Sequence, residues 1–258
     1  MGHLERLVEA ARSGAEERAA DVPEAELVTL ADDRAERRPF HEALTAPGIS
    51  VICEFKRRSP SAGELAGNSA DLAAVVASYE AGGAAAVSVL TEPTGFGGSL
   101  DDLAVARTAT SLPILQKDFL VTERQVLEAA AYGADAVLLI VAALSDAELV
   151  ALYRYARALD LDCLVETHSR EELERALELD PRILGINNRN LDDLSVDLDT
   201  TFELLPDIPA GMTVVSESGI STRAEIERLL ESGIDAALIG ESVLASGDPE
   251  SKLRELSV

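Results

Sequence analysis

Short apolar runs alternate along the chain with longer segments in which apolar residues return every three or four positions. Eight such runs are present, at residues 50–56, 85–90, 113–116, 136–141, 162–166, 183–186, 213–216 and 236–239. Apolar runs of this length are typical of strands that are buried on both faces. Several follow a glycine, such as Gly133, and glycine commonly ends a preceding helix in the left-handed conformation. The pattern therefore predicts a repeated helix–strand unit.

The segments between the predicted strands have the spacing of amphipathic helices. In one of them, Leu72, Val75, Val76 and Tyr79 fall on a single helical face. Residues that commonly cap a helix N-terminus open several segments, namely Ser69, Thr122, Ser145, Ser169 and Ser221. Eight strands that alternate with helices favour an α/β fold of the (β/α)8 TIM-barrel type over a doubly wound open sheet.

The residues before the first predicted strand, about 1–48, form an N-terminal helical extension. Charged helical patterns cover residues 4–20 and a second segment near residues 32–44, which would cap the bottom of the barrel or fold over its mouth. With 258 residues and no low-complexity linker, the chain is predicted to form a single barrel domain over residues 1–258. No apolar stretch approaches the ~20 residues of a membrane helix, and no signal peptide is evident, so we expect a cytoplasmic protein.

The chain is strongly acidic, with a formal net charge of −25. This charge repels nucleic acids and anionic lipids, so neither nucleic acid nor membrane is an expected partner. The acidic residues are spread along the chain and lysine is rare, which suggests adaptation to high salt, where the Debye length falls to about 3 Å at 1 M. Cys53 and Cys163 lie in apolar runs and are interpreted as buried, reduced thiols, not as a disulfide or a metal site.

Polar residues occur where the predicted strands end. In a (β/α)8 barrel the C-terminal ends of the strands meet at one mouth, where the chemistry of such barrels takes place. The polar residues at six strand ends include Glu54, Lys56, Lys117, Glu166, Asn187, Arg189, Glu217, Ser218 and Glu241. Only three of the 22 basic residues are lysines, and Lys56 and Lys117 are two of them. Lysine, unlike arginine, can donate a proton near neutral pH or form a Schiff base, so both are candidate catalytic residues.

Two glycine-containing turns after the last two strands predict the binding of an anion. Ser218-Gly219 follows the seventh strand, and Gly240-Glu241 follows the eighth. Backbone N–H groups at such turns bind phosphate, and barrels often bind it at this place. Residues 95–99, after the second strand, lack P-loop spacing and are interpreted as a mobile active-site loop. The residues by themselves thus predict a barrel enzyme that acts on a small phosphorylated anion.

Several segments at the strand ends also match a known family pattern. Residues 54–61 have the form E-x-K-x-x-S-P-S, and they contain Glu54, Lys56 and Ser59. Further matching segments lie at 96–99, 115–119, 165–166, 185–189, 216–220 and 239–241. With these segments the chain resembles the indole-3-glycerol phosphate synthase family over nearly its whole length. It is similar to the single-function form of that family.

The resemblance implies a reaction and a set of roles. The reaction is ring closure of 1-(2-carboxyphenylamino)-1-deoxyribulose 5-phosphate to indole-3-glycerol phosphate, with loss of CO2 and water, in tryptophan biosynthesis. No metal or organic cofactor is implied, and we expect a monomer whose partner is the small phosphorylated substrate. By match, Lys117 is the general acid that protonates the substrate ketone. The resemblance also implies that Glu166, with Glu54 beside it, assists proton transfer in the dehydration, and that Lys56 and Arg189 hold the substrate carboxylate. Asn187 and Ser218 would orient the substrate, and Glu217 would position the lysines. The phosphate would be contacted by Ser59, Gly219, Gly240 and the backbone of Glu241.

Four positions need a separate interpretation. Asn190 stands where the family pattern has Asp, which puts a charged partner for Arg189 in doubt. The side chain of Glu241 must point away from a bound anion. His41 and His168 match no functional position of the family and are interpreted as structural or surface residues.

The sequence leaves two alternatives and one electrostatic question open. The chain could be a phosphosugar aldolase that forms a Schiff base at Lys117, or a catalytically silent barrel that serves as a binding partner. The neighbouring cation Lys56 would lower the pKa of Lys117, whereas the carboxylates Glu54, Glu166 and Glu217 would raise it.

Overall fold

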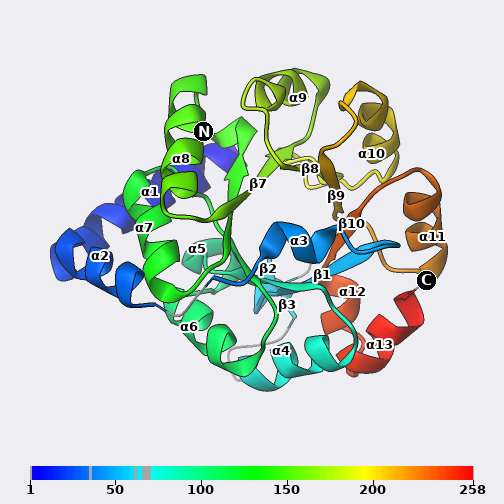
Figure 1. The fold of residues 1–258 in the computed structure, drawn as a ribbon, viewed down its shortest axis with the longest axis horizontal. Coiled ribbons are helices and arrows are strands. Elements are labelled where there is room, and N and C mark those ends of the chain that lie inside the picture. The colour runs from blue at the N-terminus through cyan, green and yellow to red at the C-terminus, as the bar shows by residue number, and fades with distance from the viewer. Residues whose placement is uncertain (1, 35–36, 61–62, 66–70, 258) are drawn as a thin grey trace.

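The computed structural model describes residues 2–34, 37–60, 63–65 and 71–257, and its central feature is a closed barrel of parallel strands (Figure 1). The strands are β1 (Ser50–Phe55), β4 (Ala86–Leu90), β5 (Ile114–Lys117), β6 (Ala136–Ile140), β7 (Asp162–Thr167), β8 (Ile183–Asn187), β9 (Thr213–Glu217) and β10 (Ala236–Ile239). Each pairs in parallel with the next, and β10 pairs with β1. All eight predicted strands are confirmed, and closure excludes the open-sheet alternative.

Helices follow the strands and surround the barrel (Figure 1). The longer ones are α4 (Leu72–Ala81), α6 (Leu100–Ala109), α7 (Glu123–Tyr132), α8 (Asp146–Ala158), α9 (Arg170–Leu177), α10 (Asp199–Leu204), α11 (Arg223–Glu231) and α13 (Pro249–Leu256). The shorter elements are the β2 (Arg58–Ser59) and β3 (Gly63–Glu64) hairpin, α5 (Pro93–Phe96), η1 (Val141–Ala143), η2 (Leu205–Asp207) and α12 (Glu241–Leu244).

The side-chain caps explain where several helices begin. Thr122, Ser145 and Ser169 each accept a hydrogen bond from a backbone N–H of the first turn, as predicted. The predicted cap Ser221 is wrong by one residue, because Thr222 is the residue that caps α11. Ser69 lies outside the described residues.

The N-terminal extension reaches both ends of the barrel. Helix α1 (His3–Asp21) agrees with the predicted helix at residues 4–20. The second predicted segment, near residues 32–44, is wrong in extent: α2 (Glu24–Asp33) and α3 (Phe40–Leu44) occupy this region, and each begins directly after a proline. A proline fits a helix start but not its interior, so Pro23 and Pro39 set these boundaries.

Helix α3 covers the bottom of the barrel, and Figure 1 shows it in front of the barrel's centre. The backbone N–H of His41 donates to Asp162 at the start of β7, and its ring contacts Thr213 at the start of β9. Helix α1 instead borders the mouth, where Leu4 and Leu7 line a small cavity together with Lys56. Both placements proposed for the extension are therefore found, each for a different helix.

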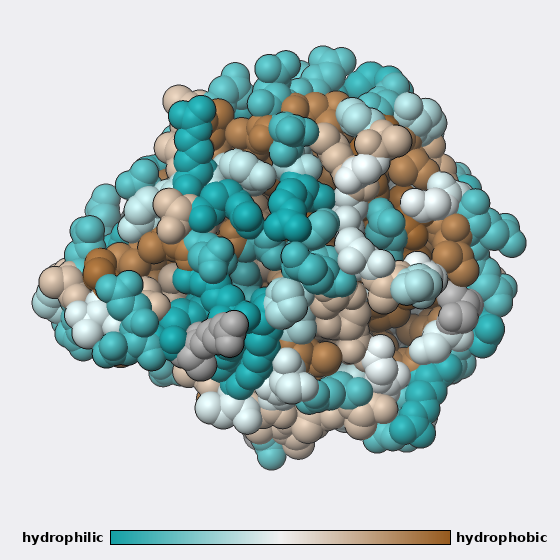
Figure 2. Space-filling model, in the orientation of Figure 1, coloured by the Kyte–Doolittle hydropathy of each residue, from teal (hydrophilic) through white to brown (hydrophobic). Residues whose placement is uncertain are grey.

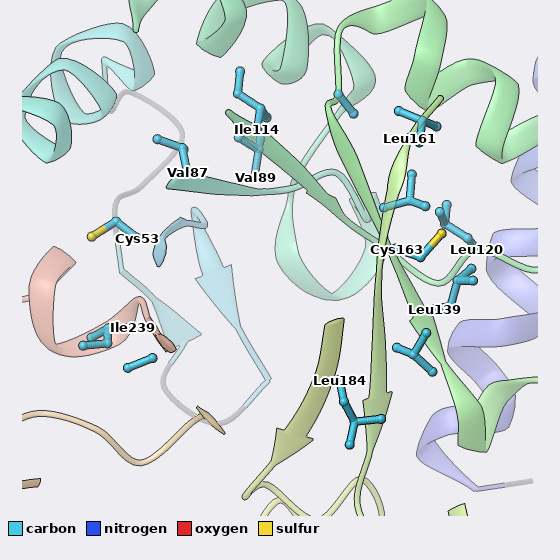
Figure 3. Close-up of a cluster of buried hydrophobic side chains, with 14 of the residues drawn as sticks. Cys53, Val87, Val89, Ile114, Leu120, Leu139, Leu161, Cys163, Leu184 and Ile239 are labelled. Atoms are coloured by element: carbon cyan, nitrogen blue, oxygen red, sulfur yellow. The ribbon is translucent and has the colours of Figure 1, made fainter. Parts of the chain in front are cut away.

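The core has an inner part inside the barrel and an outer part between strands and helices. Ile52, Leu115 and Leu164 belong to the inner cluster. The outer cluster contains, among others, Cys53, Val87, Val89, Ile114, Leu120, Leu139, Leu161, Cys163, Leu184 and Ile239 (Figure 3). Burial of each large aliphatic side chain contributes about 1.5–3 kcal/mol to folding. Both cysteines are buried and free, and burial raises the pKa of the Cys163 thiol to about 12, so they act as packing residues.

The surface at the bottom end is mostly hydrophilic, with apolar residues in scattered patches (Figure 2). Among the described residues, no helix has the length and apolar character that crossing a bilayer requires. In the same part of the chain, no group of three or more His, Cys, Asp or Glu residues is arranged to hold a metal ion.

Candidate active site

The C-terminal ends of the strands surround one cavity of about 460 Å³. Every predicted site residue except Ser59 lines it, namely Glu54, Lys56, Lys117, Glu166, Asn187, Arg189, Glu217, Ser218, Gly219, Gly240 and Glu241. Ser59 lines an adjoining cavity of about 70 Å³, which shares Lys56, Phe96 and Arg189 with the first. Residues that are far apart in sequence meet here because parallel strands end at the same edge of the barrel.

Lys117 lies between two buried carboxylates. Its Nζ is 3.1 Å from Oε2 of Glu166 and 2.6 Å from Oε2 of Glu217. Burial lowers the pKa of Lys117, but the carboxylates of Glu166, Glu217 and Glu54 outweigh burial and raise it well above its ordinary value. The question left open by the sequence is thereby answered, and Lys117 is an ammonium at neutral pH.

The two carboxylates beside Lys117 have different environments. Burial raises the pKa of Glu217, and the nearby Glu166 adds to this effect against the attraction of Lys117. For Glu166, burial is outweighed by Lys117 and His168, so its pKa is lowered. Glu217 therefore takes up a proton more readily than Glu166 does. Such a separation of the pKa values of neighbouring acids is typical of catalytic sites.

Two glycines leave room for the carboxylates. A Cβ at Gly185 on β8 would lie 2.5 Å from Oε1 of Glu217, and a Cβ at Gly240 would lie 2.7 Å from Oε1 of Glu54. No real Cβ makes contacts this short, so a larger residue at either position would displace the acid. From the sequence, Gly240 was expected only to contact the phosphate, and Gly185 was not predicted as a site residue.

A second ion pair lies at the end of β1. Nζ of Lys56 is 2.7 Å from Oε1 of Glu54, and the hydroxyl of Tyr79 donates to the backbone oxygen of Glu54. The pair is mostly buried, with 12% of the Lys56 side chain and 5% of the Glu54 side chain exposed. A second cation therefore faces the cavity that contains Lys117.

The segment after β8 forms another wall of the cavity. Oδ1 of Asn187 accepts a hydrogen bond from the backbone N–H of Arg189, and the Arg189 guanidinium donates to the backbone oxygen of Leu194. Oδ1 of Asn190 accepts from the backbone N–H of Asp192, so Asn190 stabilises the turn that follows. The amide at this position thus has a local structural role.

The turns after β9 and β10 lie next to each other on the same cavity. Ser218 and Gly219 have φ angles of 66° and 80°, the left-handed region, so the chain turns sharply directly after Glu217. Gly240 comes directly before α12, and the side chain of Ser242 donates to the backbone oxygen of Ile220. These two turns face the same space as Lys117, as predicted for an anion site.

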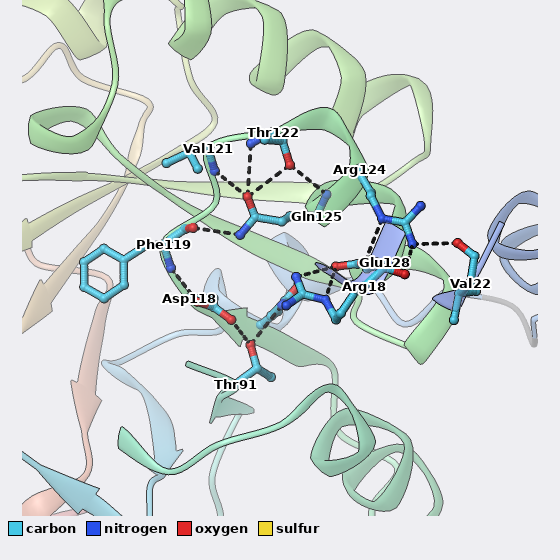
Figure 4. Close-up of polar contacts among 11 residues, drawn as sticks. Arg18, Val22, Thr91, Asp118, Phe119, Val121, Thr122, Arg124, Gln125 and Glu128 are labelled. Carbon is cyan, nitrogen blue, oxygen red and sulfur yellow. Dashed lines mark hydrogen bonds and ion pairs between the residues drawn. The ribbon is translucent and has the colours of Figure 1, made fainter. Parts of the chain in front are cut away.

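The loop after β5 is fixed by side-chain hydrogen bonds (Figure 4). Gln125 on α7 donates to the backbone oxygen of Phe119 and accepts from the backbone N–H of Val121. Asp118 accepts from the hydroxyl of Thr91 at 2.5 Å, and burial raises the pKa of Asp118 to about 6 although Thr91 and the Phe119 amide favour its ionised form. These hydrogen bonds hold the segment that follows Lys117.

The predicted mobile loop at residues 95–99 begins inside a short helix, so the prediction of a loop is wrong at its start. Gly95 and Phe96 belong to α5, because the carboxylate of Glu92 accepts hydrogen bonds from both of their backbone N–H groups. Phe96 lines the main cavity, which agrees with the predicted place at the site. The mobility of the segment stays a prediction.

His168 is a residue that sequence analysis assigned to a structural or surface role, but the structure places it against the site. Its Nε2 is 3.2 Å from Oε1 of Glu166, and its Nδ1 is 2.9 Å from Oε2 of Glu172. Burial lowers the pKa of His168, but the two carboxylates raise it to about 10. Its position two residues after Glu166, at the end of a predicted strand, was the available signal. His41 has the structural contacts at the bottom that were expected of it.

Comparisons with known proteins identify the family of the chain. Residues 4–256 match the family model described as indole-3-glycerol phosphate synthase. A relative from Streptomyces griseus is 44% identical over 99% of this chain and 95% of its own length. A relative from Micrococcus luteus is 46% identical over 98% of this chain and 96% of its own length. A relative from Nocardioides is 46% identical over 100% of this chain and 98% of its own. Each of the three is named indole-3-glycerol phosphate synthase.

Solved structures of similar shape support the fold. A thiamine phosphate pyrophosphorylase from Pyrococcus furiosus has a TM-score of 0.61 and 18% identity, over 84% of this chain and 96% of its own. An N-acetylmannosamine-6-phosphate 2-epimerase from Clostridium perfringens has a TM-score of 0.61 and 16% identity, over 81% of this chain and 93% of its own. At such identities the likeness concerns the fold alone. Because the family model matches residues 4–256 and these relatives are 44–46% identical, the chain belongs to the indole-3-glycerol phosphate synthase family.

Proposed function

We propose that the protein closes the indole ring of indole-3-glycerol phosphate from 1-(2-carboxyphenylamino)-1-deoxyribulose 5-phosphate, with loss of CO2 and water. It is then a carboxy-lyase of tryptophan biosynthesis. The observation that carries the proposal is the position of the Lys117 ammonium, which Glu166 and Glu217 hold at the main cavity. The chain's membership of the family supports the same reaction. Ketone activation requires a proton donor at such a place, because the attacked oxygen develops negative charge.

We assign the first chemical step to Lys117. Its ammonium donates a proton to the ketone oxygen while the ring carbon attacks the ketone carbon. Glu217 and Glu166 fix the ammonium from two sides, so little reorganisation is needed when the substrate arrives. In the later dehydration Glu166 assists proton transfer, with Glu54 nearby.

The remaining residues bind the substrate. Lys56 and Arg189 supply positive charge for its carboxylate, while Asn187 and Ser218 orient its hydroxyl groups. The phosphate is bound by backbone N–H groups of Gly219, Gly240 and Glu241, with Ser59 approaching from the adjoining cavity. Glu241 is exposed, which allows its side chain to point away from the anion.

The raised pKa of Lys117 favours this function over the aldolase alternative. A lysine that forms a Schiff base attacks as the neutral amine, and its pKa is lowered at such sites. Here the surrounding carboxylates keep Lys117 protonated. An acid role agrees with this charge state, whereas a nucleophilic role does not.

The test is formation of the indole product by the purified protein, followed by fluorescence after addition of the carboxyphenylamino substrate. We expect steady product formation without added metal or cofactor. A folded protein that makes no product would contradict the proposal. Borohydride reduction in the presence of substrate separates the alternatives: covalent labelling of Lys117 would indicate the aldolase, and a folded protein with neither product nor label would indicate a silent barrel.

We also propose that the acidic composition reflects adaptation to high salt. The formal charge of −25 produces self-repulsion that molar salt screens. The thermal unfolding midpoint should then rise between low and molar KCl. A midpoint that stays level or falls would contradict this proposal, without bearing on the enzymatic activity.

Finally, we propose that the chain is a cytoplasmic monomer that folds as one barrel domain. The two-part core and the contacts of α1 and α3 with opposite ends of the barrel support one folding unit. One cooperative unfolding transition and a monomer mass in sedimentation equilibrium are the expected results. A separate transition for residues 1–48, or a dimer mass, would contradict them.

A further inference from the structure

The proposed reaction, on which this inference rests, takes up one proton per turnover. The substrate carboxylate leaves as neutral CO2, so the products need one proton that the substrate does not bring. In the dehydration, one proton leaves a ring carbon and one departs with the hydroxyl group as water, which adds nothing to the balance. The proton that is consumed is the one that Lys117 gives to the ketone oxygen, and Lys117 must regain it before the next turnover.

A route for this proton has to reach a buried group. Only 15% of the Lys117 side chain is exposed, and it faces the cavity that the substrate fills. Glu166, which contacts Lys117, is 1% exposed. A path that avoids the substrate must therefore pass through protein groups.

Three ionisable side chains connect Lys117 to the outside of the barrel. Oε2 of Glu166 is 3.1 Å from Nζ of Lys117, and Oε1 of the same carboxylate is 3.2 Å from Nε2 of His168. On its other side, Nδ1 of His168 is 2.9 Å from Oε2 of Glu172. Each oxygen of Glu166 thus faces a different proton carrier.

The far end of this series lies on a second cavity of about 340 Å³. His168 and Glu172 line it, together with Ser169 and Asp192, which are exposed. Neither His168 nor Glu172 lines the main cavity. The second cavity shares Asn187, Arg189 and Leu191 with the main cavity, but the exposed Ser169 and Asp192 open it to solvent. His168 therefore lies between Glu166 and a space that water can enter.

We propose that His168 is a proton relay that reloads Lys117 through Glu166 after each turnover. The Nε2–H bond of the imidazolium breaks, and its proton moves to Oε1 of Glu166. A half-turn of the carboxyl group brings the protonated oxygen to the neutral amine of Lys117, which takes the proton. The neutral imidazole keeps the proton on its Nδ1. Because Nε2 is buried beside Glu166, the ring then rotates about the Cβ–Cγ bond, and Nε2 takes a proton from water in the second cavity. Only protons move, and one proton from solvent enters for each one consumed.

The surroundings of His168 suit this role. The charged groups that face it are Glu166 from β7 and Glu172 from α9, and they keep the imidazole protonated at neutral pH. The backbone N–H of His168 also donates to Glu172, which holds the backbone of His168 against α9. Nε2 lies within ion-pair distance of Glu166 but is not aligned for a hydrogen bond, so a small rotation precedes transfer.

The test compares single and multiple turnovers of His168→Gln with those of the wild type. Glutamine keeps an N–H donor but carries no proton to Glu166. The first turnover uses the proton already on Lys117, so its rate should stay within about twofold of wild type, while the multiple-turnover rate should fall about tenfold, less than the roughly 10²–10⁴-fold of a direct acid or base. Imidazole in the buffer should restore part of the multiple-turnover rate.

The matched control is His41→Gln, which removes an imidazole at the opposite end of the barrel. It should leave both rates unchanged and show no response to imidazole. If His168→Gln folds poorly, Glu172→Gln tests the same path with the imidazole in place. Its first-turnover rate should stay near that of the wild type, while its multiple-turnover rate should fall.

Equal losses in the first and later turnovers would overturn the relay and indicate that His168 only positions Glu166. Unchanged rates in both would overturn it as well. These outcomes require an active wild type, and a folded wild type without activity would instead overturn the proposed function.

Discussion

Two buried clusters of charged residues lie at opposite ends of the barrel, and their carboxylates are satisfied in different ways. At the bottom, Asp135 accepts hydrogen bonds from the guanidinium groups of Arg34 and Arg107 and from the backbone N–H groups of Arg38 and Ile114. At the mouth, Glu217 accepts from Lys117 through Oε2, while its buried Oε1 has no hydrogen-bond partner among the described residues.

The difference separates a structural cluster from a functional one. Asp135 has donors on both oxygens, and these donors link the N-terminal extension, α6 and β5 at the bottom of the barrel. The mouth cluster is held mainly by contacts between side chains and borders a cavity, so a substrate can complete it. Nε of Arg34 in the bottom cluster also lacks a partner within the described part of the chain, so the difference concerns the carboxylates alone. A buried carboxylate oxygen without a donor is rare in stable cores and is more often kept where function requires it.

The largest effect is expected for Glu166→Gln, which removes the charge that faces both Lys117 and His168. Activity should fall by roughly 10²-fold or more, since proton transfer by a positioned group contributes about 10²–10⁴-fold. Steady-state rates of indole formation measure this loss. The control is Glu178→Gln on the surface after α9, which should be as active as wild type. Comparable rates for Glu166→Gln and its control would contradict a role for the mouth cluster in catalysis.

Asp135→Asn should have the opposite outcome. Removing one partner of a buried ionic cluster leaves the arginines without compensation and costs about 3 kcal/mol of folding free energy. Urea unfolding measures this cost, while turnover per folded molecule should stay at the wild-type level. A large loss of turnover with unchanged stability would mean that the two clusters have been assigned the wrong way round.

Gly185→Ala tests the geometry at the mouth without changing a charge. The added Cβ would lie 2.5 Å from Oε1 of Glu217, so the carboxylate must move away from Lys117. A displacement of this kind should lower kcat by about tenfold, or about 1.4 kcal/mol of activation free energy. Gly14→Ala on α1, where the added atom meets only the flexible end of Arg18, serves as control. Wild-type kcat in Gly185→Ala would show that the position of Glu217 is not critical.

The last prediction concerns the pH dependence of stability at His168. The pKa of His168 is raised from 6.5 to about 10 in the folded protein. A raised pKa stabilises the fold fully below the unfolded value, and this stabilisation is lost as pH rises through the folded value. The difference in unfolding midpoint between wild type and His168→Gln should thus be largest below pH 6.5 and shrink towards pH 10. A difference that grows with pH would refute the charged pairing.

Much of the fold was predictable because it depends on local patterns. Each buried strand needs an apolar run, and each helix end needs a residue that can cap or end it. Strands and helix ends can therefore be recognised from the local sequence. Polar residues at strand ends predicted the mouth because the direction of a parallel strand fixes which end reaches it. Lys117 was therefore identifiable before any distance was known.

Other features depend on contacts between distant segments and could not be read from the chain. The role of Gly185 follows from its closeness to Glu217, 32 positions away, which only the register of β8 and β9 creates. The contact of His168 depends on the direction of its ring after β7. The helix at Pro93–Phe96 forms because Glu92 binds its N–H groups, although glycines nearby favour a loop.

The most direct test of the account is the rate of indole formation by Lys117→Met and by Lys252→Met, measured beside the wild type. Lys252 is the surface lysine paired with Glu255 on α13, so its loss is a matched control. The account predicts a folded Lys117→Met protein with activity lower by at least about 10²-fold, and a Lys252→Met protein as active as wild type. Equal activity of the two variants would contradict the assignment of Lys117 as the acid and of the mouth cluster as the catalytic one.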